Sequence, residues 1–419
     1  MPPLTFALLG FGTVGQAVAR LVLSTHPTLR LTHIFNREIE RKRVDWVPGD
    51  VVWTENVDEV LASPLDAVVE VAGGLEPAGS WITRALESGK AVVTANKQLL
   101  AHRGGDLLAL ASARDRGLRF EAAVCGGLPV VRMIGEGLAS DRLHRIAGVM
   151  NGTCSYILTR MEREGLGMDE ALRAAQERGY AEADPTDDID GHDAQAKLCV
   201  LSRIGLQQVI TPDQVACTSV RGVASVDFTI ARRLGYTIRQ IAEAEHDVNT
   251  RVVRCRVGPA LVPLDSLFAR VTGTQNVLQV SGDYSGETAV KGLGAGGDAT
   301  AVAVVSDLLA VADDRGAGPA TRYAAVEAPL ATTDRILGPW YLRFTVRTHS
   351  GIVADLAHAL GAHAIDVEAL HHQPGDHGVG VPLAMTVAPC DPHMLARALV
   401  EIALLDFHVG PSLAVPILQ

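Results

Sequence analysis

The feature that most constrains the fold is a glycine-rich stretch near the N-terminus, GFGTVG at residues 10–15. It follows a short apolar run, TFALL, and precedes a segment of helical periodicity, VGQAVARLVL. Glycines in a G-x-G-x-x-G pattern permit a tight turn, let the backbone approach a pyrophosphate and let the helix pack closely on the strand. The stretch therefore predicts a first βα unit whose turn binds a dinucleotide. The residues of this turn are Gly10, Phe11, Gly12, Thr13, Val14 and Gly15.

The same alternation continues through residues 1–130. Apolar runs at 29–35, 66–72, 91–95 and 118–124 predict further strands, and helical patterns lie between them. Such an alternation indicates a parallel sheet with helices on both faces, which is the Rossmann-type nucleotide-binding domain of an α/β protein.

Two further regions have different patterns. Residues 131–325 mix helical and strand-like stretches, which predicts an α+β domain, and we expect the helix at 298–313 to pack back on the nucleotide domain. A segment rich in glycine and proline at 314–339 is predicted to be a linker. Residues 340–419 then follow the order βαββαβ, which predicts a small independent unit.

The composition restricts the possible partners. Of the 419 residues 47% are hydrophobic and 20% are charged, which supports large buried cores. The net charge of −11 argues against nucleic acid or an anionic membrane as a partner. No apolar stretch has the length of a membrane span, and no basic region precedes the first apolar run as in a signal peptide. The six cysteines show no metal-binding spacing, which fits a reducing, cytoplasmic location.

The residues after the second predicted strand bear on the choice of cofactor. Sheets that bind NAD commonly carry an acidic residue there, whereas this chain has Asn36 and Arg37, with three more basic residues at 41–43. Arg37 therefore favours NADP over NAD, and the alternative is an exposed basic loop. A second glycine cluster, GLGAGGDAT at 292–300, is either a flexible turn or a place where the backbone closely approaches a ligand or another strand.

An acidic stretch, GYAEADPTDDIDGHDAQAK at 179–197, precedes an apolar helix. A calcium loop is excluded, because aligning Gly191 with the invariant glycine puts Thr186 at position 1 and Lys197 at position 12. Asp193 and Lys197 are four residues apart and so share one helix face. If that helix is buried, the lysine is a candidate acid or base; the alternative is a surface salt bridge behind a solvated loop.

These residues resemble the homoserine dehydrogenase family. The segments that carry the resemblance are the stretch 179–197, TANK (94–97), FEAAVCGGLPV (120–130), NGTCSYIL (151–158) and GAGGDATA (294–301). The resemblance covers residues 1–325, and 340–419 resembles the ACT domain of bacterial members. No kinase-like segment precedes the nucleotide motif, which implies the monofunctional form with a regulatory ACT-like domain.

The resemblance implies reduction of L-aspartate 4-semialdehyde to L-homoserine with NADPH or NADH, on the route to threonine, methionine and isoleucine. Lys197 would donate a proton to the aldehyde oxygen, with support from Asp193. Glu182 would bind the α-ammonium of the substrate, and Lys97 would lie beside the nicotinamide and the substrate. Thr94 and Gly296 are further residues implied at the cofactor.

The resemblance also implies a monovalent cation, usually sodium, at Glu121 and the backbone carbonyls of Val124, Gly126 and Leu128, since oxygen ligands suit a hard cation. It implies a homodimer or homotetramer whose middle region is the catalytic and dimerisation domain. An amino-acid effector at the C-terminal domain is expected, but THSGIVADL lacks the Pro-Gly pair of many sensing members, which leaves threonine control open. The chain also has Cys154–Ser155 where the family commonly has Thr-Asn.

Two other functions are weighed against this one. Another NAD(P)-dependent oxidoreductase of a small amino acid or alcohol would share the nucleotide domain. A non-catalytic amino-acid sensor would be expected to lack the glycine loop or the lysine, and this chain has both.

Overall fold

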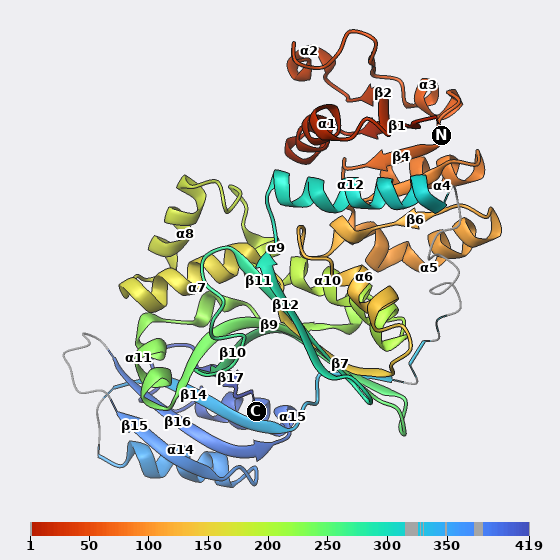
Figure 1. Ribbon diagram of the computed structural model, residues 1–419. Coiled ribbons are helices and arrows are strands. Elements are labelled where there is room, and N and C mark those ends of the chain that lie inside the picture. Colours follow the sequence, from red (N-terminus) through yellow and green to blue (C-terminus); the bar gives the residue numbers. More distant parts are fainter. Residues whose placement is uncertain are drawn as a thin grey trace.

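The computed structural model describes residues 2–314, 326, 328, 329, 331–347, 350–372 and 380–418. Three sheets follow one another along the molecule, with the N-terminal parallel sheet at the top of Figure 1, a long mixed sheet in the middle and the C-terminal sheet at the bottom. Of the predicted linker at 314–339, residues 315–325, 327 and 330 lie outside the described residues, and residues 331–333 form a short strand.

The first sheet has the strand order β3-β2-β1-β4-β5-β6, and each neighbouring pair is parallel. This order confirms the Rossmann-type prediction and puts the topological switch point, where such sheets bind ligands, between β1 and β4. The strands are β1 (Leu4–Leu9), β2 (Leu29–Phe35), β3 (Val52–Thr54), β4 (Ala67–Glu70), β5 (Ala91–Thr94) and β6 (Leu118–Arg119). The helices are α1 (Thr13–Thr25), α2 (Ile39–Lys42), α3 (Val57–Ala62), α4 (Ala78–Glu87) and α5 (Lys97–Ala113).

The predicted strand at 118–124 is wrong beyond its first two residues. After β6 the chain forms a short 3₁₀ helix, Glu121–Ala123. The backbone N–H of Glu121 donates to Asp307 Oδ2 at 2.9 Å, so the chain is held by a helix that comes 186 residues later rather than by a neighbouring strand. This tertiary contact overrides the apolar pattern of the segment.

Helix α12 (Gly297–Asp314) packs on the parallel sheet together with α1, as predicted, although it comes after the middle sheet in sequence (Figure 1). Ala301, Val304 and Leu308 share a hydrophobic core with Phe6 and Leu8 of β1. The chain therefore returns to its first sheet just after the second glycine cluster.

The middle sheet has the order β12-β11-β7-β9-β10-β13, with β8 paired to β10. Its strands are β7 (Leu143–Val149), β8 (Ala216–Cys217), β9 (Tyr236–Asp247), β10 (Val252–Pro263), β11 (Gln275–Gly282), β12 (Gly286–Leu293) and β13 (Ala331–Thr333). Its helices are α6 (Val130–Arg132), α7 (Gly152–Glu164), α8 (Met168–Glu177), α9 (Thr186–Ile189), α10 (His192–Leu201) and α11 (Ser225–Arg233), with short 3₁₀ or π segments at Met133–Gly137, Ser202–Leu206, Pro212–Gln214 and Val220–Gly222. One hydrophobic core joins α5 of the first region to α10 of the second.

The C-terminal sheet is antiparallel, in the order β15-β16-β14-β17, and confirms the βαββαβ order of an ACT-like domain. Its elements are β14 (Gly338–Val346), α14 (Ile352–Gly361), β15 (Val367–His372), β16 (Val381–Cys390), α15 (Pro392–Ile402) and β17 (Leu413–Pro416). Two helices cover one face, whereas on the other face Tyr341 and Val415 share a core with Phe228 and Ile238 of the middle region. The middle region therefore buries this face of the unit, and the independence of residues 340–419 stays a prediction.

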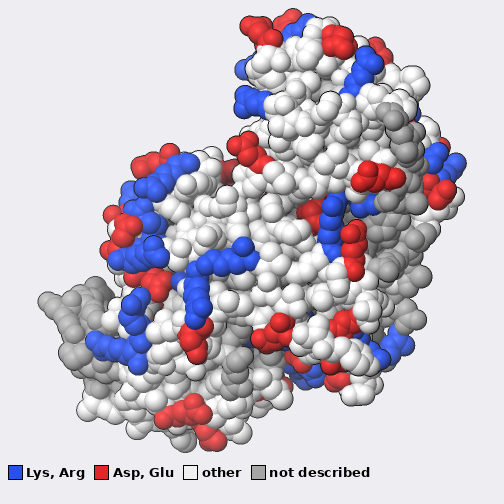
Figure 2. Space-filling model, viewed as in Figure 1, with Lys and Arg blue, Asp and Glu red and all other residues white. Residues whose placement is uncertain are grey.

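The surface in Figure 2 carries acidic and basic side chains interspersed, with pale uncharged areas between them. None of the described helices is sufficiently long and apolar to cross a membrane. All six cysteines are free thiols, and four of them are buried.

Candidate active site

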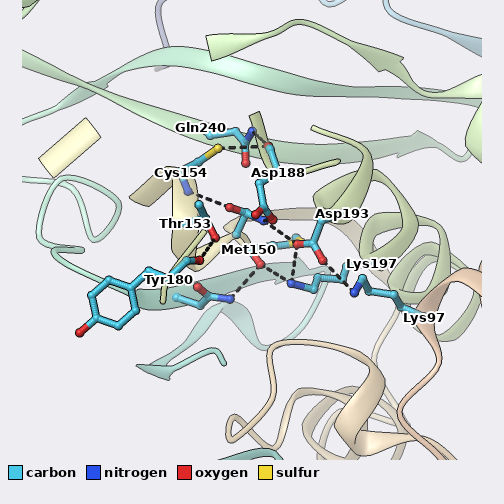
Figure 3. Close-up of polar contacts among 11 residues, drawn as sticks. Lys97, Met150, Thr153, Cys154, Tyr180, Asp188, Asp193, Lys197 and Gln240 are labelled. Atoms are coloured by element: carbon cyan, nitrogen blue, oxygen red, sulfur yellow. Dashed lines mark hydrogen bonds and ion pairs between the residues drawn. The ribbon is translucent and has the colours of Figure 1, made fainter. Parts of the chain in front are cut away.

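A carboxylate and two lysines meet where α5 packs against α10 (Figure 3). Asp193 Oδ2 lies 2.7 Å from Lys197 Nζ one turn further along α10, and Asp193 Oδ1 lies 3.0 Å from Nζ of Lys97, the first residue of α5. The side chains of Asp193 and Lys197 are only 11% and 10% exposed, whereas that of Lys97 is 33% exposed. The pair predicted from the spacing is therefore buried, and the surface salt bridge is excluded.

Helix α10 is buried because the sequence around the pair is small or apolar. Ala194, Ala196 and the run from Leu198 to Leu201 are all buried. The helix begins after Gly191, whose φ of +92° is readily adopted by glycine, and a Cβ at this position would lie 3.0 Å from a methyl group of Val257. The chain can thus turn sharply from the acidic loop into the interior and carry a charged pair with it.

The ammonium of Lys197 has a second acceptor. Lys197 Nζ donates to the Met150 carbonyl at 2.7 Å, and the same oxygen accepts from Asn276 Nδ2 at 2.9 Å. An ammonium has three N–H donors. Among the described residues two of them are used, by Met150 and Asp193, so the third is left for a ligand.

Asn151 links two carboxylates of the acidic stretch. Its Nδ2 donates to Asp193 Oδ2 at 2.8 Å and to Asp188 Oδ1 at 2.6 Å, and its Oδ1 accepts from the backbone N–H of Cys154 at the start of α7. Because the residue caps α7, its amide is fixed in direction. Asp188 and Asp193 are therefore held on the same side of the site (Figure 3).

The charges in this cluster stabilise one another. Burial alone would raise the pKa of Asp193, but Lys197 and Lys97 outweigh it and hold this pKa below its ordinary value. Burial alone would lower the pKa of Lys197, but Asp193 outweighs it and holds this pKa above its ordinary value. Burial raises the pKa of Asp188. At neutral pH the site thus holds a buried ammonium that can donate a proton.

The remainder of the acidic stretch is not gathered at the lysine. Glu182 is exposed, and its backbone carbonyl accepts from Gln176 Nε2 at 3.1 Å. Asp184 accepts from the Thr186 hydroxyl at 2.6 Å, which stabilises the turn before α9. The structure therefore brings Asp193 and Lys197 together, whereas Glu182 lies on the surface of the loop with no side-chain partner among the described residues.

The predicted phosphate loop has the expected geometry. Gly10 has a φ of +110°, and a Cβ on Gly15 would lie 2.3 Å from the Gly10 carbonyl oxygen, so both positions require glycine. Gly12 precedes α1, which begins at Thr13. Phe11 is buried against Trp53, with ring centroids 4.9 Å apart. Val14 packs at the edge of the same core.

The second glycine cluster is a site of close backbone approach. A Cβ on Gly126 would lie 2.8 Å from the carbonyl oxygen of Gly294, and one on Gly297 would lie 3.0 Å from the Thr13 side chain. Gly296 has a φ of +110°. Of the two interpretations left open by the sequence, the structure supports close approach, and the turn lies against the phosphate loop.

Two predicted cofactor residues lie at the ends of strands. Arg37 lies two residues after the end of β2, is exposed and has no partner in the described part of the chain. Thr94 ends β5 and is buried, and its hydroxyl donates to Glu70 Oε2 at 2.7 Å. Both lie at the carboxyl edge of the parallel sheet, where its ligands bind.

The residues implied for a cation lie in one loop, 121–128, in which some backbone carbonyls accept no hydrogen bond from the described residues. Glu121 accepts from the backbone N–H groups of Val131 and Arg132, and burial followed by the nearby Asp307 raises its pKa to about 7. Within the described residues, no hydrogen bond reaches the carbonyls of Val124 and Gly126, and the Leu128 carbonyl accepts from Val130 at 2.8 Å. No group of three or more His, Cys, Asp or Glu side chains suits a metal among the described residues. The free carbonyls fit a hard monovalent cation, whereas the Glu121 side chain is already occupied.

Sequence reasoning missed several residues that build the site. These are Glu70, Met150, Asn151, Asp188 and Asn276. Asn151 and Asp188 lie within two segments that carry the family resemblance, so their polar side chains could have been predicted to belong to the site. Asn276 lies inside an ordinary strand pattern, and Met150 acts through its backbone, so the sequence carries no signal for either.

The sequence model of the homoserine dehydrogenase family matches residues 129–309, and that of the homoserine dehydrogenase NAD-binding domain matches residues 10–121. A homoserine dehydrogenase of Mycobacterium leprae is 38% identical over 366 residues, covering 84% of this chain and 82% of its own length. The chain belongs to the homoserine dehydrogenase family. Its members are NAD(P)-dependent oxidoreductases that reduce aspartate semialdehyde to homoserine, and this assigns the reaction of the present enzyme.

Other relatives extend the match to the C-terminal region. A homoserine dehydrogenase of Pseudomonas aeruginosa is 31% identical and aligns over 100% of both chains. The crystal structure of a homoserine dehydrogenase from Thiobacillus denitrificans superposes with a TM-score of 0.90 at 32% identity, covering 100% of this chain and 99% of the other. A hyperthermophilic archaeal homoserine dehydrogenase in complex with NADPH has a TM-score of 0.64 at 27% identity, covering 75% of this chain and 98% of the other.

Proposed function

We propose that Lys197 is the proton donor of this homoserine dehydrogenase reaction. NADPH or NADH supplies a hydride to the aldehyde carbon when it is bound. The carbonyl oxygen gains negative charge, takes a proton from Lys197 Nζ and becomes the hydroxyl of homoserine. The observation that carries this role is a buried ammonium with two of its three donors fixed, by Met150 and Asp193, at 2.7 Å each.

Asp193 and Lys97 support the donor. Asp193 keeps Lys197 charged before transfer, and it is itself kept ionised by Lys97 on its other oxygen. A preorganised cation aimed at developing charge is among the largest contributions to catalysis. We assign Lys97 a place beside both the substrate and the nicotinamide, because it is the more exposed of the two lysines and begins a helix at the carboxyl edge of the parallel sheet.

The carboxylates of the acidic stretch bind the amino group of the substrate in this proposal. Glu182 is exposed and without a side-chain partner among the described residues, so its charge is available to an α-ammonium. Asp188 lies deeper and is joined to Asp193 through Asn151. The two carboxylates would orient the substrate so that its aldehyde faces Lys197.

The cofactor is bound at the phosphate loop, Gly10–Gly15, with Thr94 and Gly296 nearby, and we propose that NADP is preferred. Arg37 supports this preference, since it is exposed and follows β2 where an acid would select NAD. Arg37→Asp should weaken NADP binding about tenfold more than NAD binding, which corresponds to roughly 1.4 kcal/mol. Arg30→Asp, a matched charge reversal at an exposed position of β2, serves as control. Equal losses for both cofactors would show that Arg37 does not meet the 2′-phosphate.

We further propose that a monovalent cation, sodium by preference, is held by the backbone carbonyls of the 121–128 loop. The free carbonyls of Val124 and Gly126 support this assignment. The cation would fix the loop that contacts the second glycine cluster through Gly126. It takes no part in the transfer of hydride or proton.

The regions carry separate roles in this proposal. Residues 1–130 bind the nucleotide with α12 packed on them, residues 131–325 form the catalytic and dimerisation domain of a homodimer or homotetramer, and residues 340–419 bind a regulatory amino acid. A cytoplasmic location fits six free thiols.

One assay tests the proposed reaction. Purified enzyme is mixed with L-homoserine and either NADP or NAD, and absorbance of the reduced nicotinamide is followed. We expect turnover with homoserine, faster with NADP. Turnover of another amino acid or alcohol, with homoserine left untouched, would favour the alternative oxidoreductase instead.

A further inference from the structure

A buried carboxylate at the switch point of the parallel sheet is not used by the reaction described above. Glu70 ends β4 and its side chain has no solvent exposure. Its Oε1 accepts from the backbone N–H groups of Ala72 at 2.9 Å and Gly73 at 2.8 Å, and its Oε2 accepts from the Thr94 hydroxyl at 2.7 Å. No cationic side chain pairs with Glu70 in the part of the chain that the structure describes. Burying a carboxylate without a cation costs free energy, and the three hydrogen-bond donors directed at Glu70 offset this cost. A carboxylate retained here at such a cost indicates that the arrangement it holds is needed.

The contacts of Glu70 continue to the start of α5. Thr94 Oγ1, which donates to Glu70, also accepts from the backbone N–H of Asn96 at 3.0 Å. Asn96 caps α5 by accepting from Leu99 N at 3.1 Å, and its Nδ2 donates back to the Gly74 carbonyl at 2.6 Å. Residues 70–74 and 94–96 are therefore closed into one ring of hydrogen bonds. The next residue after this ring is Lys97.

The same ring borders the phosphate loop. A Cβ on Gly10 would lie 3.0 Å from the backbone of Val71 and Ala72, so the turn after Glu70 is in direct contact with the first glycine of the loop. The ring thus lies between the loop and Lys97. A displacement of this turn would move both the cofactor-binding loop and the lysine that contacts Asp193.

We propose that Glu70 is a positioning residue of the reaction. Its carboxylate fixes the turn after β4 and, through Thr94 and Asn96, fixes the first turn of α5. This places the ammonium of Lys97 on Asp193 Oδ1, and Asp193 in turn holds Lys197. The inference rests on the proposed roles of Lys97 and Lys197.

The experiment is a double-mutant cycle between Glu70→Ala and Lys97→Ala, with kcat, KM, the Kd of NADPH and the fraction of folded enzyme measured for each variant. We expect Glu70→Ala to lower kcat per folded molecule by about tenfold to a hundredfold, the usual cost of a misplaced catalytic group. We expect the kcat of the double variant to fall no further than that of the worse single variant, because both changes reach the proton donor through Lys97, whereas a shift of the phosphate loop would be measured in the Kd of NADPH. Glu70→Gln keeps one side-chain oxygen that can accept from the backbone N–H groups of Ala72 and Gly73, and its amide can still contact the Thr94 hydroxyl. This variant should therefore recover part of the lost kcat.

A control carboxylate, exposed rather than buried, lies next to the opposite end of the same strand. Asp66, just before β4, also holds its neighbours, with Oδ2 accepting from the backbone N–H and the hydroxyl of Thr5 at 2.7 Å each, at the end of the sheet away from the site. Asp66→Ala should leave kcat per folded molecule unchanged. Thr94→Val cuts the same ring from its other end and should act like Glu70→Ala, so it tests the proposal even if Glu70→Ala does not fold.

The outcomes separate this inference from the proposed function. A loss in Lys97→Ala with normal kcat in Glu70→Ala and Thr94→Val would overturn the role of Glu70 alone. Fully additive losses would also overturn it, since they would show that Glu70 does not act through Lys97. Normal kcat in Lys97→Ala would overturn the role of Lys97 and this inference with it.

Discussion

Two buried aspartates of this enzyme each contact basic side chains, and in our proposal they have different tasks. Asp193 lies in the first turn of α10 and contacts Lys197 and Lys97. Asp227 lies in the first turn of α11, and its Oδ1 accepts from Arg343 Nε at 2.7 Å and from the Tyr341 hydroxyl at 2.8 Å, both on β14 of the C-terminal sheet. Each aspartate joins two regions of the molecule. Asp193 on α10 contacts α5 of the first region, and Asp227 on α11 contacts β14 of the C-terminal sheet.

The difference between the two networks lies in how far their side chains are exposed. Around Asp227, Oδ2 caps α11 by accepting from Ala224 N at 2.8 Å, and the guanidinium of Arg343 also donates to the Gly222 carbonyl at 2.7 Å. Around Asp193, Lys197 retains one N–H that no described residue accepts. We call the Asp227 network closed, because its carboxylate is fully buried and the Arg343 side chain is 11% exposed, and the Asp193 network open, because it includes Lys97, whose side chain is 33% exposed. The chemistry of the side chains is similar, and in our proposal access to a ligand separates the catalytic network from the structural one.

The largest expected effect is at the closed network. Arg343→Ala leaves Asp227 buried without its cation and should lower the free energy of unfolding by about 3–5 kcal/mol. The kcat of the folded fraction should remain within about twofold, since the network does not touch the site. Urea denaturation and kcat per folded molecule measure both effects. Arg335→Ala, an exposed arginine 3.9 Å from Asp391, should cost less than about 1 kcal/mol, and an equal cost in the two variants would contradict the distinction.

The open network should respond in the opposite way. Lys197→Ala should lower kcat about 10²-fold or more, the usual scale for a general acid or an oxyanion donor. The Kd of NADPH should be little changed, because the phosphate loop lies on another element. Steady-state kinetics with a parallel cofactor titration measure both quantities, with Lys291→Ala on exposed strand β12 as control. A Lys197→Ala enzyme with near-normal kcat would mean that Asp193 and Lys197 are a structural pair like Asp227 and Arg343.

A smaller effect is expected at the exposed end of the acidic stretch. Glu182→Ala should raise KM for the amino acid about tenfold with kcat little changed, as expected for the loss of ground-state binding to a charged group. The stability of this variant should be unaffected, since the Glu182 side chain has no hydrogen bond or ion pair among the described residues. Glu177→Ala, an exposed acid on α8, is the control. An unchanged KM in Glu182→Ala would leave the ammonium to Asp188.

The smallest effect concerns pH. The two lysines hold the folded-state pKa of Asp193 below its ordinary value, so its stabilisation is present above the unfolded pKa of about 3.9 and is lost as the pH falls further. Burial raises the folded-state pKa of Asp227 despite Arg343, so its contribution is greatest at low pH and is lost as the pH rises through that raised value. The stability difference between wild type and Asp193→Asn should therefore shrink on acidification, and that for Asp227→Asn should grow. Urea midpoints between pH 2 and pH 7 measure both, since the Asp193 contribution changes only below about pH 3.9, and the same trend in both variants would contradict the comparison.

Local patterns in the sequence determined much of the fold. Glycines that require positive φ or close approach, such as Gly10 and Gly15, predicted a tight turn between the first strand and the first helix, and the structure has it, because those positions exclude side chains on local grounds. The alternation of apolar runs predicted the parallel sheet, and the i,i+4 spacing of Asp193 and Lys197 predicted a pair on one helix face. The strand expected at 118–124 was wrong, since Glu121 is held instead by Asp307 from a distant helix.

Only the tertiary structure decided which polar groups complete the site. Lys97 reaches Asp193 from a helix almost a hundred residues earlier, and the acceptor opposite Asp193 is a backbone carbonyl, that of Met150, which every residue type possesses. It also decided that Asp193 works in an open network and Asp227 in a closed one, and that the C-terminal sheet shares its core with the middle region. The physical reason is that local sequence sets backbone conformation and burial tendency, whereas the partners and the exposure of a charged side chain depend on every element that packs around it.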